Sequence, residues 1–514
     1  MIQDLFSHKI HSSSPEWPDK LVELAHIFNE FDGRAYDRTA IENKLRSISP
    51  RVAVSAAEMA RDPSKFRDEI SAYPAYLGLY RLEYREGQWV LYLSETAKRF
   101  LVSEEPDVGA FMRLQLCLFQ YPNGMGVAYS GGDARIQANA RVRTLELIGQ
   151  NIHVSPLRLL CASLIADSRL RNVDLIAAYL GIDEFYALVN NNQINQTSVS
   201  SVEKLMEALS EIRAGRINPP DSYESRFHIL DHTEIISRSR DQLSFRQPEN
   251  DTDREDLIKK IYTICKIDSQ FNGFDTARSG EDLMVVIRKG SWGSYFDGVR
   301  TLSAEQVSIL ASDVAMGVSG GTTFSPARTL AVPPTPTPTP APLRYALRRH
   351  TIHGLPLRTM SRREELADPE VTRIKRERRS LAHKQMVSAL DDLLRTKGAD
   401  PQENPHIDLY AEIPNDGAYL FEVKSGGENL LAQVRKGVSQ LYEYKFRYRG
   451  NIRDDAVLCL VLPNKPTGIA WLEEYLCNDR GIAICWLDGE GAVTPAPLCR
   501  DKLNDFLNAP VAYT

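Results

Sequence analysis

Residues 407–424 read Ile-Asp-Leu-Tyr-Ala-Glu-Ile-Pro-Asn-Asp-Gly-Ala-Tyr-Leu-Phe-Glu-Val-Lys. This pattern predicts a short strand carrying Asp408, a Pro-Asn-Asp-Gly turn, and a second strand ending in Glu-Val-Lys. Side chains alternate along a strand, so Glu422 and Lys424 leave the same face. The hairpin can bring Asp408 beside them. Two carboxylates next to one ammonium group form a metal site with its own cation, the combination that phosphodiester hydrolysis needs.

The segments around this hairpin have the pattern of a compact α/β sheet domain. Helical spacing and apolar runs predict helices over 379–395, 430–449 and 468–478, and strands over 456–462 and 482–487. The strand at 456–462 is apolar at every position, as expected for a central strand covered by helices on both faces.

The helix after the hairpin carries two further motifs, Gln433-Val-Arg-Lys and Gln440-Leu-Tyr-Glu-Tyr. Together with Asp408 and the Glu422-x-Lys424 motif, it resembles the PD-(D/E)XK superfamily of restriction-endonuclease-like nucleases. The similarity covers about the last 135 residues. It implies a C-terminal α/β domain with the restriction-endonuclease-like fold.

The resemblance also implies a catalytic role for four residues. Asp408 and Glu422 would bind Mg²⁺ or Mn²⁺, hard cations that prefer oxygen ligands. Lys424 would orient the attacking water or help to deprotonate it, and would offset charge on the phosphate. Gln440 would position water or phosphate.

Contacts to nucleic acid are implied on both helices that flank the strands. Gln433, Gly437, Gln440 and Tyr444 recur at helical spacing and share one helix face, which in the family lies against the catalytic strands. The residues expected to contact nucleic acid are Gln433, Arg435, Lys436, Tyr444, His383 and Arg379.

The helix predicted over 379–395, which precedes the hairpin, departs from the family pattern. Many members place a glutamate there, whereas this helix offers His383 and Gln385 at positions expected to face inward, with Glu377 upstream. His383 can serve as a metal ligand or phosphate contact, or it can be structural.

A basic segment precedes this helix. Residues 344–384 contain twelve arginines and lysines and five acids, a local net charge of +7 in a chain whose overall charge is -6. Such a run is either a solvated face or a contact for phosphates.

The sequence of the N-terminal third predicts a helix–turn–helix followed by a β-hairpin. Helices are expected over 20–31 and 37–48, hairpin strands over 79–82 and 89–93, and a helix capped by Ser94. This order suggests a winged helix, which either reads DNA or serves only in packing. More loosely, residues 80–82, 93–100 and 111–115 resemble the winged-helix recognition regions of type II restriction endonucleases.

The middle of the chain has weaker signals. A helix is expected at 157–164, a turn at 167–168 and another helix over 172–180. Residues 200–270 show one helical stripe and no assignable unit, and 290–298 predict a loop supported by aromatic packing. The expected domains are 1–150 (winged-helix-like), 151–330 (helical or winged-helix-like), a Pro/Thr linker at 331–343, and 344–514 (nuclease).

Composition excludes several other classes of protein. Charged residues make up 25% and hydrophobic residues 43% of 514 residues, which is ordinary for a globular protein. The seven cysteines form no C-x-x-C pair and lie in apolar runs, so we expect buried free thiols and no zinc knuckle. No signal peptide and no apolar run of roughly 20 residues is visible, so we expect a cytoplasmic protein without a membrane partner.

The sequence therefore predicts a multidomain, Mg²⁺- or Mn²⁺-dependent endonuclease acting on DNA, most simply duplex DNA. A restriction or anti-phage defence role fits this organisation, with a homodimer or larger assembly for double-strand cleavage and a partner protein of a defence system. Two alternatives are open: a nucleic-acid-binding sensor whose nuclease-like domain does not cut, and a nuclease that acts on RNA or single strands.

Overall fold

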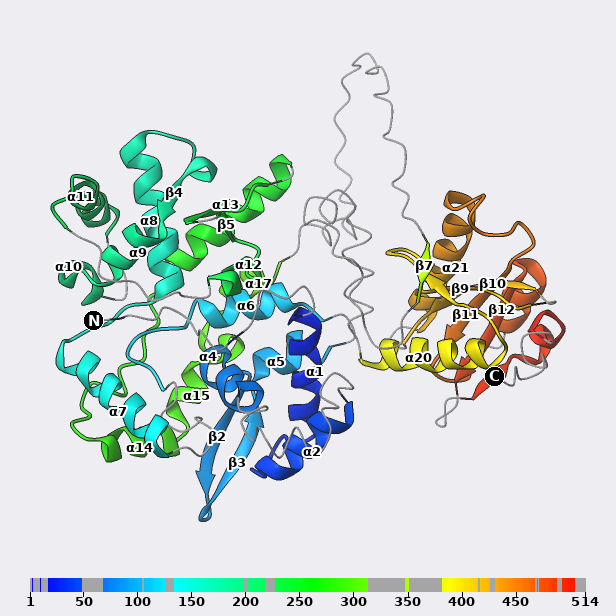
Figure 1. The fold of residues 1–514 in the computed structure, drawn as a ribbon, viewed down its shortest axis with the longest axis horizontal. Coiled ribbons are helices and arrows are strands. Elements are labelled where there is room, and N and C mark those ends of the chain that lie inside the picture. The colour runs from blue at the N-terminus through cyan, green and yellow to red at the C-terminus, as the bar shows by residue number, and fades with distance from the viewer. Residues whose placement is uncertain are drawn as a thin grey trace, which may run out of the picture. The chain divides into compact units, whose positions relative to one another are not determined.

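The chain forms two compact units, Met1–Val314 and Ala315–Thr514 (Figure 1). The structure, a computed structural model, describes residues 2, 10, 17–48, 68–103, 106–124, 134–197, 201–217, 227–239, 241–248, 250–312, 347–350, 381–414, 417–425, 430–466, 469, 471–487 and 492–503. The expected Pro/Thr linker and residues 351–380 of the basic segment lie outside these ranges.

The first unit opens with helices and a β-hairpin, as the sequence predicts. The elements are α1 (Trp17–Asn29), β1 (Arg34–Ala35), α2 (Arg38–Ile48), η2 (Asp68–Ala72), α4 (Tyr73–Leu77), β2 (Tyr80–Arg85) and β3 (Gln88–Leu93). β1 pairs with β3 to give a sheet in the order β1-β3-β2. Glu86 and Gly87 both have positive φ, 50° and 85°, so a two-residue turn closes the hairpin.

A buried aspartate connects the beginning of this unit to its end. Helix α5 (Glu95–Phe100) is capped by Ser94, as predicted, and also by the carboxylate of Asp297. Asp297 accepts hydrogen bonds from the backbone N–H of Glu95 at 2.8 Å and of Thr96 at 3.1 Å, and from the Thr96 hydroxyl at 2.7 Å. The unit has one hydrophobic core, which includes residues on both sides of the boundary expected near residue 150.

The turn predicted at residues 167–168 is wrong. Helix α8 (Pro156–Arg171) continues through Asp167 and ends at Asn172, which has a left-handed conformation. The buried Asp167 carboxylate pairs with Arg171 one helical turn later and with Arg213 at 2.8 Å. The helix predicted over 172–180 is also wrong, because this segment forms the short 3-10 helix η3 (Leu175–Ala177) and strand β4 (Tyr179–Gly181).

The remainder of the first unit is mainly helical. Its elements are α6 (Val108–Leu116), α7 (Ala134–Gly149), α9 (Ile182–Val189), α10 (Asn192–Asn195), α11 (Val202–Arg213), α12 (His228–Asp231), β5 (Ile236–Ser239), β6 (Gln242–Phe245), α13 (Asp251–Cys265), α14 (Gly280–Arg288), α15 (Ser291–Tyr295), α16 (Gly298–Thr301) and α17 (Ala304–Ala311). Strands β4, β6 and β5 form a second three-stranded sheet. The segment at 290–298 is packed among aromatic rings, as predicted, but contains the short helix α15 rather than only a loop.

The C-terminal unit is an α/β domain built on a seven-stranded mixed sheet. The elements are β7 (Arg348–Arg349), α20 (Leu381–Thr396), β8 (Gln402–Glu403), β9 (Leu409–Glu412), β10 (Ala418–Val423), α21 (Leu430–Arg447), β11 (Val457–Leu462), α22 (Leu472–Glu474), η5 (Tyr475–Asp479), β12 (Ile482–Leu487), β13 (Val493–Pro495) and η6 (Pro497–Cys499). The strand order is β13-β12-β11-β10-β9-β8-β7. β10, β11 and β12 run parallel to one another, and the other neighbours are antiparallel.

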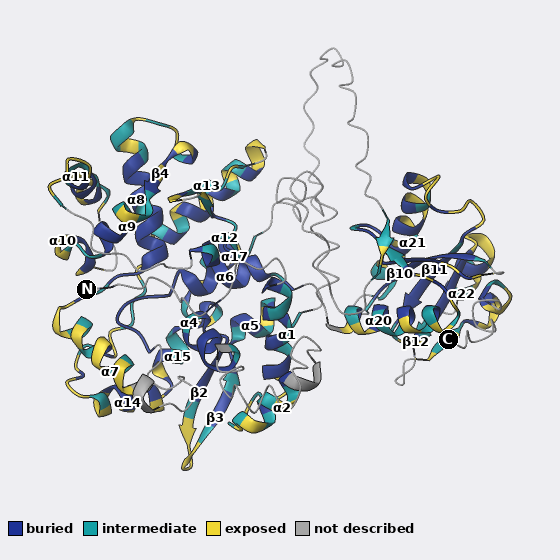
Figure 2. Cartoon of the chain, in the orientation of Figure 1, coloured by how far each residue is buried: buried dark blue, intermediate teal, exposed yellow. Residues whose placement is uncertain are grey.

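Strand β10 lies in the middle of this sheet and is buried at every position (Figure 2). Its neighbours β9 and β11 both belong to the hydrophobic core of the unit. The hairpin and central strand predicted from the sequence are therefore confirmed, and any polar side chain on β10 must find its partners inside the protein.

A buried ion cluster attaches the edge strand β7 to α20. The Asp391 carboxylate is fully buried, lies 2.9 Å from Nδ1 of His350 and accepts a hydrogen bond from Nε of Arg395 at 2.8 Å. Burial opposes ionisation of Asp391, but the hydrogen bonds with His350 and Arg395 outweigh it and hold the pKa of this carboxyl below its usual range.

The expectation of free cysteines is wrong for one pair. Cys477 of η5 and Cys499 of η6, whose Cα atoms lie 5.7 Å apart, form a disulfide. Among the remaining five, Cys459 and Cys485 are buried thiols of the C-terminal unit, and burial raises the pKa of both. Within the described part of the chain, no helix is long and apolar enough to cross a membrane.

Candidate active site

The two predicted metal-binding carboxylates lie at the point where the pairing of β9 and β10 ends. The last paired residues are Leu409 and Phe421, and Asp408 directly precedes β9 while Glu422 continues β10. The backbone N–H of Val423 donates to Oδ2 of Asp408 at 2.8 Å, which fixes the position of that carboxylate.

Lys424 provides a cation at the end of β10. Its Nζ donates a hydrogen bond to Oε1 of Glu422 at 2.7 Å, and the Lys424 side chain is only 3% exposed. Its backbone N–H donates to the carbonyl of Val461 at 2.9 Å, so the pairing with β11 extends through this residue. The sheet itself therefore holds the lysine beside the carboxylate.

Helix α20 brings a histidine to the same cluster. Nε2 of the buried His383 lies 3.3 Å from Oδ2 of Asp408. Gln385, which the sequence analysis placed inward, is exposed instead. Residues two positions apart on a helix point about 200° apart, so His383 and Gln385 cannot both face the sheet. Arg379 and Glu377 lie outside the described residues.

Helix α21 approaches the cluster through a glycine. A Cβ atom on Gly437 would lie 2.5 Å from Cδ1 of Leu460, 3.5 Å from Cε of Lys424 and 3.7 Å from Cγ of Glu422. A side chain at position 437 would therefore compete with the core for space. The absence of a side chain lets the helix backbone lie directly over the carboxylate and the lysine.

One turn further along, the inward face of α21 continues as predicted. Gln440 is buried, and its Nε2 donates to the hydroxyl of Tyr444 at 3.0 Å. The ring of Tyr444 stacks on His406, with centroids 5.3 Å apart and an interplanar angle of 22°. Gln433 at the start of this face is half-buried.

His406 and Asn404 were not predicted from the sequence as site residues. The fully buried His406 lies with Nδ1 2.6 Å from the hydroxyl of Tyr448, and Oδ1 of Asn404 accepts hydrogen bonds from the N–H groups of His406 and Ile407. These contacts fix the chain immediately before Asp408. The sequence pattern that could have indicated these two residues is the polar run Asn-Pro-His, which directly precedes an apolar strand.

The structure thus buries six of the predicted residues, which are Tyr444 and the five that follow. Asp408, Glu422, Lys424, His383 and Gln440 are all 3–4% exposed. Arg435 is exposed and Lys436 half-buried. The predicted catalytic set therefore lies in the core, whereas two of the predicted nucleic-acid contacts lie at or near the surface.

The carboxylates of Asp408 and Glu422 are oxygen donors of the kind that a hard divalent cation prefers. Within the described ranges, no three His, Cys, Asp or Glu side chains form a group that could hold a metal ion by themselves. Mg²⁺ is usually bound by one or two carboxylates, with water and substrate phosphates as its other ligands. Asp408 and Glu422 can provide that smaller set.

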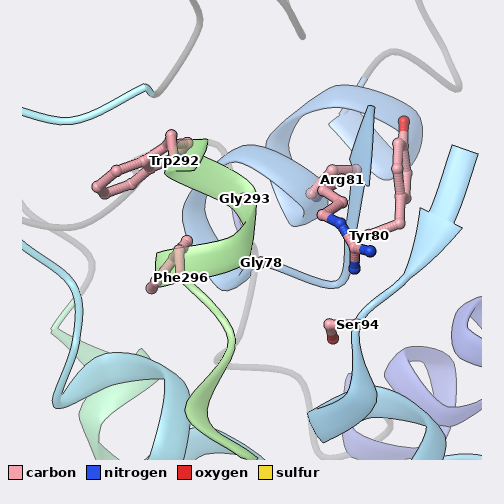
Figure 3. A pocket seen from close by; sticks show the side chains of 8 residues that line it. Gly78, Tyr80, Arg81, Ser94, Trp292, Gly293 and Phe296 are labelled. Atoms are coloured by element: carbon pink, nitrogen blue, oxygen red, sulfur yellow. The ribbon is translucent and has the colours of Figure 1, made fainter. Parts of the chain in front are cut away.

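A small pocket lies in the first unit (Figure 3). It is lined by Pro74, Gly78, Tyr80, Arg81, Ser94, Trp292, Gly293 and Phe296. Nη1 of Arg81 is buried with no hydrogen-bond partner among the described residues. A guanidinium and a hydroxyl can bind water or a small anion, but they provide neither a general base nor metal ligands. The carboxylate–lysine cluster is therefore the stronger candidate for catalysis.

The chain matches no protein-family model and no curated protein.

Proposed function

We propose that the C-terminal unit is a metal-dependent endonuclease of the PD-(D/E)XK type, which hydrolyses phosphodiester bonds in DNA. One observation carries the proposal. The backbone N–H of Val423, the residue after Glu422, donates to the Asp408 carboxylate at 2.8 Å, and the buried ammonium group of Lys424 contacts Glu422 at 2.7 Å. Burying two carboxylates and a lysine together is costly for a fold that needs only stability, so a chemical role is favoured.

Each residue has a distinct part in this proposal. Asp408 and Glu422 would hold Mg²⁺ or Mn²⁺, which lowers the pKa of a bound water and stabilises charge on the phosphate when present. Lys424, already oriented by Glu422, would donate to the attacking water or to a phosphate oxygen. His383 would orient the Asp408 carboxylate, and Gln440 would position water or phosphate.

The first unit would deliver the nucleic acid. Its α1–β1–α2 order, followed by η2 and α4 and a hairpin whose second strand, β3, pairs with β1, supports a winged-helix assignment. Such a module would bind duplex DNA or a partner protein. A restriction or anti-phage defence role in the cytoplasm, with a homodimer for double-strand cleavage, is part of the same proposal.

A second candidate function is a nucleic-acid-binding sensor that does not cut. It is favoured by one observation: each carboxylate already contacts a side chain of the protein, Asp408 with His383 and Glu422 with Lys424. In a silent domain these contacts would be permanent. In the enzyme they would exchange when metal and phosphate enter.

The two candidates are separated by incubating the full-length chain with supercoiled plasmid and Mg²⁺ or Mn²⁺. The nuclease should convert the plasmid to nicked or linear forms, and EDTA should stop the conversion. Salt-dependent binding without cleavage in either metal would instead support the sensor. Parallel reactions with duplex DNA, single-stranded DNA and RNA identify the substrate.

A further inference from the structure

Helix α21 has an outward face that is unlike its inward one (Figure 2). Tyr442 and Phe446 are four residues apart, so they share one face of α21, opposite to Gly437 and Gln440, and Arg449 follows just after the helix ends. Tyr442 is 42% exposed and Phe446 is 60% exposed. The guanidinium of Arg449 lies over the Phe446 ring, 3.9 Å from its centroid.

This face continues onto the segment around α22 and η5. The hydroxyl of Tyr442 donates to the backbone carbonyl of Arg480. The Arg480 guanidinium lies 5.0 Å from the centroid of the Tyr475 ring, which in turn meets Trp471 edge-on at 5.8 Å. Trp471 is 51% exposed. We call this continuous set the aromatic–arginine strip: Trp471, Tyr475, Arg480, Tyr442, Phe446 and Arg449.

We infer that the aromatic–arginine strip binds single-stranded DNA. Exposed rings are platforms on which unpaired bases stack, and interleaved guanidinium groups match the negative charge of the backbone. Tyr442 and Phe446 lie about 6 Å apart along the helix axis, so each ring can stack a separate base. Bases in a duplex are stacked on each other and are not accessible to such rings.

The charges on the α21 part of the strip agree with an anionic occupant, whereas the segment of Trp471, Tyr475 and Arg480 also carries Glu473, Glu474 and Asp479. Glu443, the acid next to Tyr442 on α21, is paired with Arg447 at 2.8 Å, so part of its charge is offset. Arg435, exposed two helical turns before Tyr442, extends the same face with a further cation.

That the ligand is DNA rests on the proposed function. The new part of the inference is that the C-terminal unit binds single strands. The same helix carries Gly437 and Gln440 on its inward face, over Glu422 and Lys424. A helix is about 10 Å across, so a strand held on the outer face lies within a few nucleotides of the carboxylate–lysine cluster.

The test measures binding of the full-length chain to a fluorescent oligothymidylate of about 20 nucleotides, longer than one typical site, in EDTA so that nothing is cut. Phe446→Ala and Trp471→Ala should each weaken binding about tenfold, the effect of losing one stacked base. Phe446→Trp, which keeps a ring, should bind like the wild type. Tyr262→Ala removes a similarly exposed ring, 41% exposed, from the first unit and is the matched control. Duplex binding should be unchanged in all four variants.

Several results would overturn the inference. They are a wild type that does not bind the oligothymidylate, alanine variants that bind it normally, tighter binding of oligouridylate, or variants that lose self-association while binding DNA normally. Cleavage is scored separately with metal. A chain that binds single strands through the strip but does not cut would reject the proposed nuclease and leave this inference standing.

Discussion

Nζ of Lys424 lies 2.7 Å from Oε1 of Glu422, and both side chains are almost completely buried. Residues 422 and 424 are on one strand, so the alternation of side chains alone places them on the same face. Burial makes each group dependent on the other, because an unpaired charge in the core is costly. This mutual dependence can be measured.

Lys424→Met should destabilise the C-terminal unit by about 3 kcal/mol, because it leaves the Glu422 carboxylate buried without its cation. Adding Glu422→Gln should restore most of that loss, and both variants should fail to cleave DNA. Hydrogen exchange of the β10 amides reports the local stability. If the double variant is less stable than Lys424→Met, the two side chains do not compensate each other's charge.

His383→Ala should lower the cleavage rate and the apparent affinity for Mg²⁺ about tenfold or more, because residues that orient a metal-binding carboxylate typically contribute that much. The exposed neighbour Gln385 is the matched control, and Gln385→Ala should cleave normally. A metal titration of the cleavage rate provides both quantities. Equal metal dependence in wild type and His383→Ala would remove this histidine from the site.

Gly437→Ala should destabilise the unit despite the better helix propensity of alanine. The added Cβ would lie 2.5 Å from Cδ1 of Leu460, and overpacking costs about 1–3 kcal/mol. Leu460→Ala makes room and should reduce the cost of Gly437→Ala in a double-mutant cycle. Gly149→Ala at the end of α7, where a Cβ meets nothing within 4 Å, is the control. Additive effects at 437 and 460 would contradict the predicted contact.

Asp391 makes the stability of the C-terminal unit depend on pH. Its folded-state pKa is lowered, so it lies below the unfolded value of about 3.9. The ionised carboxylate therefore stabilises the fold above that pH, and this contribution is lost as the pH falls through the folded-state pKa.

Asp391→Asn should accordingly cost about 3 kcal/mol at neutral pH, the usual penalty for breaking a buried pair. The difference from wild type should shrink below about pH 4. Asp392→Asn, at the exposed next position of α20, should change little. Thermal unfolding across the pH range measures the stability of both variants relative to the wild type. A difference that stays constant down to about pH 3 would contradict the role of Asp391.

The local parts of the fold could be predicted from the sequence. The hairpin that carries Asp408 and Glu422 follows from alternation and turn residues, and the inward face of α21 follows from the helical period of Gly437, Gln440 and Tyr444. These patterns depend only on near neighbours, so a single sequence contains them.

The parts that depend on distant residues could not be predicted. Residues 167–168 form part of a helix and not the predicted turn, and the distant Arg213 pairs with the Asp167 carboxylate there. Asp297 caps α5 from more than two hundred residues away. The pairing of Cys477 with Cys499 likewise depends on how η5 and η6 pack, and no local pattern encodes it.

The most direct test of the central claim is the rate at which the full-length chain cuts plasmid DNA in Mg²⁺, compared with Asp408→Asn and Lys424→Met. The account predicts cleavage by the wild type and a loss of about a thousandfold or more in each variant, with DNA binding in EDTA unchanged. Cleavage by both variants at the wild-type rate, or no cleavage by the wild type in Mg²⁺ or Mn²⁺ despite binding, would contradict it.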